Sequence, residues 1–418
     1  MPELSERDDE HLRVMLRDTT DHLRLPERLT DTVRTGALRR TRRHRALGAG
    51  LGVIAVTMAV AAVTAVAIWP GSDDGPTTAA VGVNTSPTPR GTLPDKCLLH
   101  VLATPANAEF SSVTGGDPSG RYLLTRSSQG AAKQVRIWTG DSSRVVAMTG
   151  EDAELDDVNA AGTAVGSSFV KESPTAWLYR NGAVQRLAGD SVSAKAINSG
   201  NLVVGLRVSG PGLEQPVVWR ALDRPAEQLP LPDGALGGRA VDVADDGTIV
   251  GVVHLPGGAN QGYVWLPNGE HRQLPPPVVA GRQAAGYWPT SIHGTVIDGT
   301  ADVAFDQPKR RVMEPVMFDL TTGTFTAFPE DLVESVGNGR GIRAGQGDGG
   351  AVLSDGRRHV RLDQLATQTG APTSVPTDAP TAPSRVPTVV FISDDARTLA
   401  GRAADANGVT KAVVWRCQ

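Results

Sequence analysis

Few residues of this chain stand at a spacing that suits catalysis. The eight histidines form no HxxxH or HExxH pair, and neither cysteine belongs to a complete set of His, Cys and carboxylate residues with the spacing of a metal site. There is no GxSxG nucleophile motif, no GxxxxGK phosphate loop and no paired His–Glu set. The sequence therefore predicts no metal site, no cofactor and no enzymatic activity.

The acidic and amide residues recur instead of clustering. Asp156, Asn198, Asp242 and Asp394 each follow a short apolar strand and precede a turn, which contains Gly in every case but the last. Because the same residue types return in successive units, their chemistry is better explained by turn formation than by catalysis. We interpret them as structural residues.

One segment has the composition of a contact surface. The connection 276–289 carries Arg282, Tyr287 and Trp288, and an aromatic pair beside an arginine suits a glycan or protein ligand. The alternative is that Trp288 packs in the core. The sequence predicts this segment as the candidate binding loop.

The two cysteines, Cys97 and Cys417, mark the ends of the repeating region. The last unit stops at Cys417 without its fourth strand, and residues 97–105 resemble the strand that is missing. If the first strand completes the last unit, the two cysteines become neighbours and can form a disulfide in an oxidising exterior. The alternative is two unrelated free thiols.

Internal repeats define the region between the cysteines. Each unit has an apolar strand, a turn with Gly, a strand leading into Val-Gly or Ala-Gly, a variable loop, a strand carrying an aromatic residue and a fourth strand. Phe318 and Leu353 are expected at the aromatic place in two degenerate copies. The other expected core residues are Trp138, Trp177, Trp219, Trp265 and Trp415.

Units of this kind bury their faces on one another when they are arranged radially. The sequence therefore predicts an all-β, seven-bladed β-propeller with four-stranded blades. An open β-solenoid is the alternative. The 47 Gly and 29 Pro suit such a turn-rich chain, and a net charge of −4 excludes a general nucleic-acid binder.

These units resemble the HAF-type extracellular repeat family. The best matches are residues 196–205 with Trp219 and residues 241–251 with Trp265, although the His of the family pattern is absent. The resemblance implies an extracellular, propeller-like fold and no defined activity.

A membrane anchor is predicted upstream. Residues 47–68 carry no charge and would span about 33 Å as a helix. Five arginines precede this segment, whereas Trp69, Asp73 and Asp74 follow it, so the N-terminus is expected in the cytoplasm. A cleaved signal peptide is the alternative, but the charged region before the apolar run is unusually long.

The flanking segments complete the predicted organisation. Residues 1–45 are expected to form a short helical cytoplasmic segment, 46–69 the transmembrane helix, 70–95 a Pro/Thr-rich linker and 96–418 the extracellular propeller. A second tract of this composition, 367–384, is expected as a surface loop. Tail and anchor together loosely resemble actinobacterial membrane proteins of the anti-sigma-factor type.

These features lead to a functional prediction with alternatives. The chain is expected to be a membrane-tethered extracellular binding module for a glycan or protein, signalling to a cytoplasmic partner such as a sigma factor. The second hypothesis is an extracellular hydrolase or lyase that uses the central cavity of the propeller. The third is a purely structural cell-envelope protein.

Overall fold

A computed structural model describes residues 81–84, 91–105, 107–130, 132–210, 212–256, 260–305, 310–327, 332–347, 350–365, 387–405 and 407–418. The predicted tail 1–45, the membrane segment 46–69 and the tract 367–384 lie outside these residues. Within the ranges described, no helix has the length and apolarity needed to cross a membrane.

The described part is an all-β fold with one short helix, α3 (Leu362–Leu365). Four antiparallel four-stranded sheets account for half of the strands. The first two are β7 (Glu151–Val158), β8 (Ala164–Val170), β9 (Ser173–Arg180), β10 (Ala183–Arg186), and β11 (Val192–Ile197), β12 (Val203–Gly210), β13 (Leu213–Trp219), β14 (Glu227–Gln228). The other two are β15 (Gly237–Val243), β16 (Ile249–His254), β17 (Asn260–Trp265), β18 (His271–Gln273), and β25 (Val333–Gly337), β26 (Arg343–Gly347), β27 (Gly350–Ser354), β28 (His359–Arg361).

Two larger sheets contain similar antiparallel runs. The eight-stranded sheet comprises β2 (Cys97–Val101), β3 (Phe110–Gly116), β4 (Tyr122–Gln129), β5 (Ala132–Thr139), β6 (Ser142–Val146), β29 (Thr388–Ile392), β30 (Thr398–Ala404) and β31 (Thr410–Cys417). The seven-stranded sheet comprises β1 (Val81–Asn84), β19 (Pro277–Val279), β20 (Arg282–Gln283), β21 (Gly286–His293), β22 (Val296–Phe305), β23 (Arg310–Asp319) and β24 (Thr324–Ala327).

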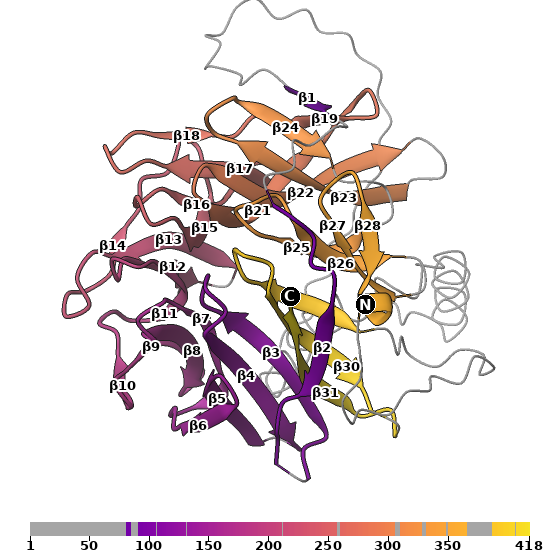
Figure 1. The fold of residues 1–418 in the computed structure, drawn as a ribbon. Helices are drawn as coiled ribbons and strands as arrows, with labels where there is room; N and C mark the ends of the chain where they lie inside the picture. The colour runs from indigo at the N-terminus through magenta and orange to yellow at the C-terminus, as the bar shows by residue number, and fades with distance from the viewer. Residues whose placement is uncertain are drawn as a thin grey trace, which may run out of the picture. The chain divides into compact units, whose positions relative to one another are not determined.

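The beginning and the end of this region meet, as the sequence predicts. β2 pairs antiparallel with β31, and this register places Cys97 opposite Cys417, where the two form a disulfide. Figure 1 shows β2 beside β31 and the sheets following one another in chain order. Because β29 and β31 also contact β3, the last strands close onto the first and complete a ring.

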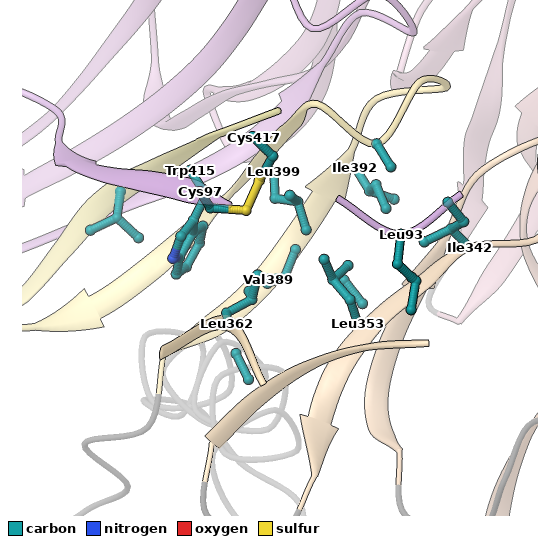
Figure 2. Packing of buried hydrophobic residues seen from close by; sticks show 14 residues of the cluster. Leu93, Cys97, Ile342, Leu353, Leu362, Val389, Ile392, Leu399, Trp415 and Cys417 are labelled. Atoms are coloured by element: carbon teal, nitrogen blue, oxygen red, sulfur yellow. A yellow bond between two sulfur atoms is a disulfide. The ribbon is translucent and has the colours of Figure 1, made fainter. Parts of the chain in front are cut away.

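The disulfide borders a large apolar cluster. Figure 2 shows the Cys97–Cys417 bond with Trp415 and Leu399 beside it and Leu353 farther away in the same cluster. These residues come from β2, from β29–β31 and from β25–β28, so the cluster joins neighbouring sheets. The apolar core of this fold therefore lies mainly between the sheets.

Part of the predicted linker belongs to this fold. β1 pairs in parallel with β19 through Val81 and Gly82 and with β24 through Val83 and Asn84. The segment 70–95 therefore contributes an added strand beside β24, which its Pro- and Thr-rich composition does not predict.

The repeated Val-Gly has a steric cause. A Cβ built on Gly205 would lie 2.0 Å from the carbonyl oxygen of Ser193 on the neighbouring strand. The same conflict arises at Gly166, Gly251 and Gly401, where the distances to a carbonyl oxygen are 2.1, 2.1 and 1.9 Å. Glycine is required in these four runs because the first strand approaches the second too closely for any side chain.

The repeated asparagine joins one sheet to the next. Asn198 accepts from the backbone of Leu202 in its own turn, and its Nδ2 donates to the Ala244 carbonyl at 2.9 Å. Asn159 and Asn338 each donate to the following sheet in the same way, Asn159 to the carbonyl of Asn198 and Asn338 to the carbonyl of Ser393. The turn residues therefore stabilise the contacts between sheets.

The aromatic place in the third strand is occupied largely as predicted. Trp138, Trp219, Trp265, Phe318 and Trp415 are buried, each in a cluster shared with the preceding sheet. Trp177 is different. Tyr179 pairs with Ala164 and occupies the aromatic place of its sheet, while Trp177 lies earlier in β9 and is only half-buried.

Leu353 was also predicted at this place, and the structure corrects the assignment. Leu353 packs in the cluster on the other side, toward β29–β31. The next residue, Ser354, points toward the preceding sheet, as the aromatic residues do, and lies opposite Arg343. Because successive side chains of a strand point to opposite faces, an error of one residue reverses the face.

Candidate functional site

The predicted binding loop does not present its three residues together at the surface. Tyr287 is fully buried, its hydroxyl donates to the Ile297 carbonyl at 3.0 Å, and its ring meets the edge of Phe325. Trp288 is half-buried and follows in β21, so it points to the opposite face of the strand. Arg282 lies in the short strand β20. The segment is largely strand, and its first aromatic residue is a core residue.

A different set of residues faces the middle of the ring. The first strands of the successive antiparallel runs are β3, β7, β11, β15, β21, β25 and β29. Consecutive first strands lie close to one another around the ring at most joints, which makes them the inner layer.

Each inner strand contains an irregularity in its pairing with the next strand. At these β-bulges an extra residue interrupts the register, and its side chain is released from the alternation of the strand. The residues at the bulges are Thr114, Asp156, Lys195, Val241, Thr290, Ser335 and Val390.

Exposure separates the bulge residues from their neighbours. Lys195 is partly exposed in a strand whose other residues are buried, and Val390 is 37% exposed between buried neighbours. Since these strands form the inner layer, this exposure is directed to the middle of the ring. The bulge therefore selects which side chains line that space.

Two neighbouring bulges carry opposite charges. Lys195 Nζ donates to Asp156 Oδ1 at 2.8 Å. The Lys195 side chain is 36% exposed and the Asp156 side chain 19%. The second carboxylate oxygen, Asp156 Oδ2, is shielded from solvent and has no hydrogen-bond partner among the described residues. Ionising this carboxyl is therefore costly in spite of the ammonium beside it.

The titration of Asp156 reflects this position. Burial raises the pKa of Asp156 from 3.8 to about 6; Lys195 opposes the shift and Glu154 adds to it. The Asp156 carboxylate in turn raises the pKa of Lys195, which stays an ammonium at neutral pH. A carboxyl with a pKa near the working pH can donate or accept a proton in a reaction.

A second ion-pair group lies beside the first. Arg126 on β4 pairs with Glu154 at 2.6 Å and with Asp152, both on β7. The Arg126 side chain is 12% exposed, and Glu154 is held on the same strand as Asp156. Arg126 therefore fixes the strand that presents the carboxyl.

Two further inner carboxylates have a structural role. Asp157 accepts from the backbone of Val158 and, across the joint, from Ile197 at 2.8 Å. Asp242 accepts in the same way from Val243 and from Ile292. Burial, above all, raises the pKa of both carboxyls, with weaker effects of neighbouring charges. Their oxygens are engaged by backbone amides, so Asp156 is the better candidate for chemistry.

This arrangement corrects the interpretation of the repeat acids as one structural class. Asn159, and not Asp156, occupies the turn place of Asn198, whereas Asp156 stands on the bulge. Each bulge residue lies three residues before the turn place of its strand, and its type changes from strand to strand. Within the described ranges, no cluster of three or more His, Cys, Asp or Glu residues could hold a metal ion.

Solved structures with some similarity include parts of peptidases. The β-propeller domain of the Trilobed protease from Pyrococcus furiosus has a TM-score of 0.49 at 10% identity, over 74% of this chain and 94% of that one. The acylaminoacyl peptidase of Pyrococcus horikoshii has a TM-score of 0.47 at 12% identity, and the match covers 74% of this chain and 52% of that one. Puromycin hydrolase has a TM-score of 0.41 at 14% identity, and the match covers 79% of this chain and 59% of that one.

The chain thus spans about half the length of that acylaminoacyl peptidase. No family model matches this chain, and no curated protein matches it. The structural likenesses nevertheless contradict two predictions from the sequence, the non-enzymatic binding module and the absence of enzymatic activity. The proteins named above are a protease, a peptidase and a hydrolase. The sequence analysis assigned the Asp156 carboxyl to a turn, whereas the structure places it on a bulge.

Proposed function

We propose that residues 97–418 form a seven-bladed β-propeller. The four separate four-stranded sheets supply four blades, and β21–β24 a fifth. The eight-stranded sheet supplies two more, since β3–β6 and β29–β31 are joined by one parallel pair, Phe110 with Thr410. β2 then serves as the fourth strand of the last blade, beside β31.

We propose that this propeller acts as an extracellular hydrolase, held at the membrane by the segment predicted at 47–68. The observation that supports this most directly is the Asp156–Lys195 pair on adjacent inner bulges. The pair unites a carboxyl whose pKa is near 6 with a permanent positive charge at a partly exposed place.

The two side chains would divide the chemistry of hydrolysis. The ionised form of Asp156 can accept a proton from the attacking water, and the protonated form can give one to the leaving group. The Lys195 ammonium can stabilise the negative charge that develops on the attacked group. Arg126 and Glu154 keep the strand of Asp156 in place for both steps.

The proposal is tested by assaying the purified full-length chain against chromogenic esters, peptide anilides and glycosides. For a substrate that is cleaved, Asp156→Asn is expected to lower kcat/KM by about 100-fold or more. The pH profile of the wild-type protein should have an inflection near pH 6, which the residual activity of the variant lacks.

Asp190→Asn is the matched control. It makes the same change in an ion pair with Arg186, where the Asp190 side chain is fully exposed. Equal rates for wild type and Asp156→Asn, or no cleavage of any substrate class, would refute the proposal.

A further inference from the structure

The joint between β21–β24 and β25–β28 is built differently from the others, and we call it the Arg343 joint. At the other joints, the residue opposite the aromatic place is apolar, as in the pairs Val203–Trp219 and Ile249–Trp265. At the Arg343 joint this cross-strand pair is Arg343 and Ser354, and both are buried.

The arginine is matched by a carboxylate from the facing sheet. Arg343 Nη2 donates to Asp298 Oδ1 at 2.8 Å, and the two side chains are 1% and 2% exposed. Asp298 Oδ2 has no hydrogen-bond partner among the described residues. A buried ion pair loses most of its Coulombic gain to desolvation, whereas an aromatic side chain in its place would add apolar contact.

The backbone contact at this joint also differs. The inner strands β25 and β29 lie close together, as do β15 and β21, but β25 approaches β23 more closely than it approaches the inner strand β21. Among the described side chains, the apolar cluster here contains Val296, Met317, Leu332 and Val352. The cluster at the next joint, shown in Figure 2, is much larger.

The place where the chain closes is held far more firmly. We call the contact of β31 with β2 and β3 the disulfide joint. There β2 and β31 are paired along their length and cross-linked by Cys97 and Cys417. A ring that opens must therefore separate elsewhere.

We propose that the ring opens transiently at the Arg343 joint, while the disulfide joint stays closed. The opening would admit substrate to Asp156, and this role rests on the proposed function. The opening itself is a property of the free protein and can be measured without any substrate.

The opening is tested by placing a thiol inside each joint. Ser354 at the Arg343 joint and Ser111 at the disulfide joint are both fully buried, and each hydroxyl accepts one backbone amide. Ser354→Cys and Ser111→Cys are therefore matched variants, and the native cysteines are protected by their disulfide. The rate of reaction with Ellman's reagent in native buffer reports how often each thiol becomes accessible.

The Ser354→Cys thiol is expected to react at least about tenfold faster than the Ser111→Cys thiol. Adding Asp298→Leu and Arg343→Met, which replace the ion pair by apolar contact, should slow the reaction of Ser354→Cys by about tenfold. Equal rates at the two joints would overturn the proposal, and so would a Ser354→Cys rate that the apolar pair leaves unchanged. If the triple variant does not fold, the comparison of the two single variants decides.

Inactivity of the protein toward every substrate would leave this result unaffected. Failure of the proposed function and failure of the opening are therefore distinguishable.

Discussion

The inner strands contain two neighbouring places that behave in opposite ways. At the turn that ends the strand, Asn159, Asn198 and Asn338 recur and make the same hydrogen bonds to the next sheet. At the bulge a few residues earlier, the residue changes type from strand to strand, as Asp156 and Lys195 show.

The difference separates what the fold requires from what it leaves free. A side chain that joins sheets can make the same hydrogen bond in several copies, because the geometry repeats, as the three asparagines do. A side chain that faces the middle of the ring has no repeated partner, so it can differ without loss of the fold. Function is therefore expected at the places that break the repeat, and stability at the places that keep it.

The largest effect is expected at the repeated glycine. Gly205→Ala would place a Cβ 2.0 Å from the Ser193 carbonyl oxygen, so the two strands must separate. We expect a loss of about 3 kcal/mol or more in the free energy of unfolding, measured by urea denaturation. Gly210→Ala on the same strand is the control, since its nearest contact is a side-chain carbon at 3.5 Å. Equal losses for the two variants would show that the close approach is unimportant.

A smaller loss is expected at the repeated asparagine. Asn198→Ala removes the bonds to Ala244 and Leu202 and leaves buried backbone groups without partners. The expected cost is about 2 kcal/mol in chemical denaturation. Asn268→Ala removes one bond in an exposed turn, to Glu270, and should cost less than about 1 kcal/mol. A neutral Asn198→Ala would contradict the proposed joining role.

A third effect concerns the pH dependence that the bulge carboxyl imposes. Because the pKa of Asp156 is raised to about 6 in the folded protein, its folded form binds a proton more tightly than the unfolded chain does. Stability from this group is present at low pH and is lost as the pH rises from about 4 to about 6, by up to about 3 kcal/mol.

Asp156→Asn should remove this loss. Relative to the variant, the wild type is then more stable at pH 4 than at pH 7, as urea denaturation at the two pH values can measure. The raised pKa of Asp242 is present in both proteins and cancels in the difference, whereas the pKa of Asp157 loses only the weak contribution of the Asp156 charge. A constant difference between wild type and variant across this range would show that Asp156 titrates normally.

Several errors of the sequence analysis share one cause. Leu353 was assigned the place of Ser354, and Trp177 the place of Tyr179, because an aromatic or large apolar residue was expected in each copy. Tyr287 was assigned to a surface loop, although its hydroxyl and ring are satisfied inside the core. Register and burial depend on the facing strand, which lies outside the local pattern.

The strand repeats and their glycines are local properties, and the sequence by itself determined them. It also determined that Cys97 and Cys417 come together, since an incomplete last unit and a spare first strand have one pairing that completes both. Only the tertiary structure decided which residues stand on the bulges and which joint is held by Arg343 and Asp298. A bulge and an interface each need two strands or two sheets to exist, so no single segment encodes them.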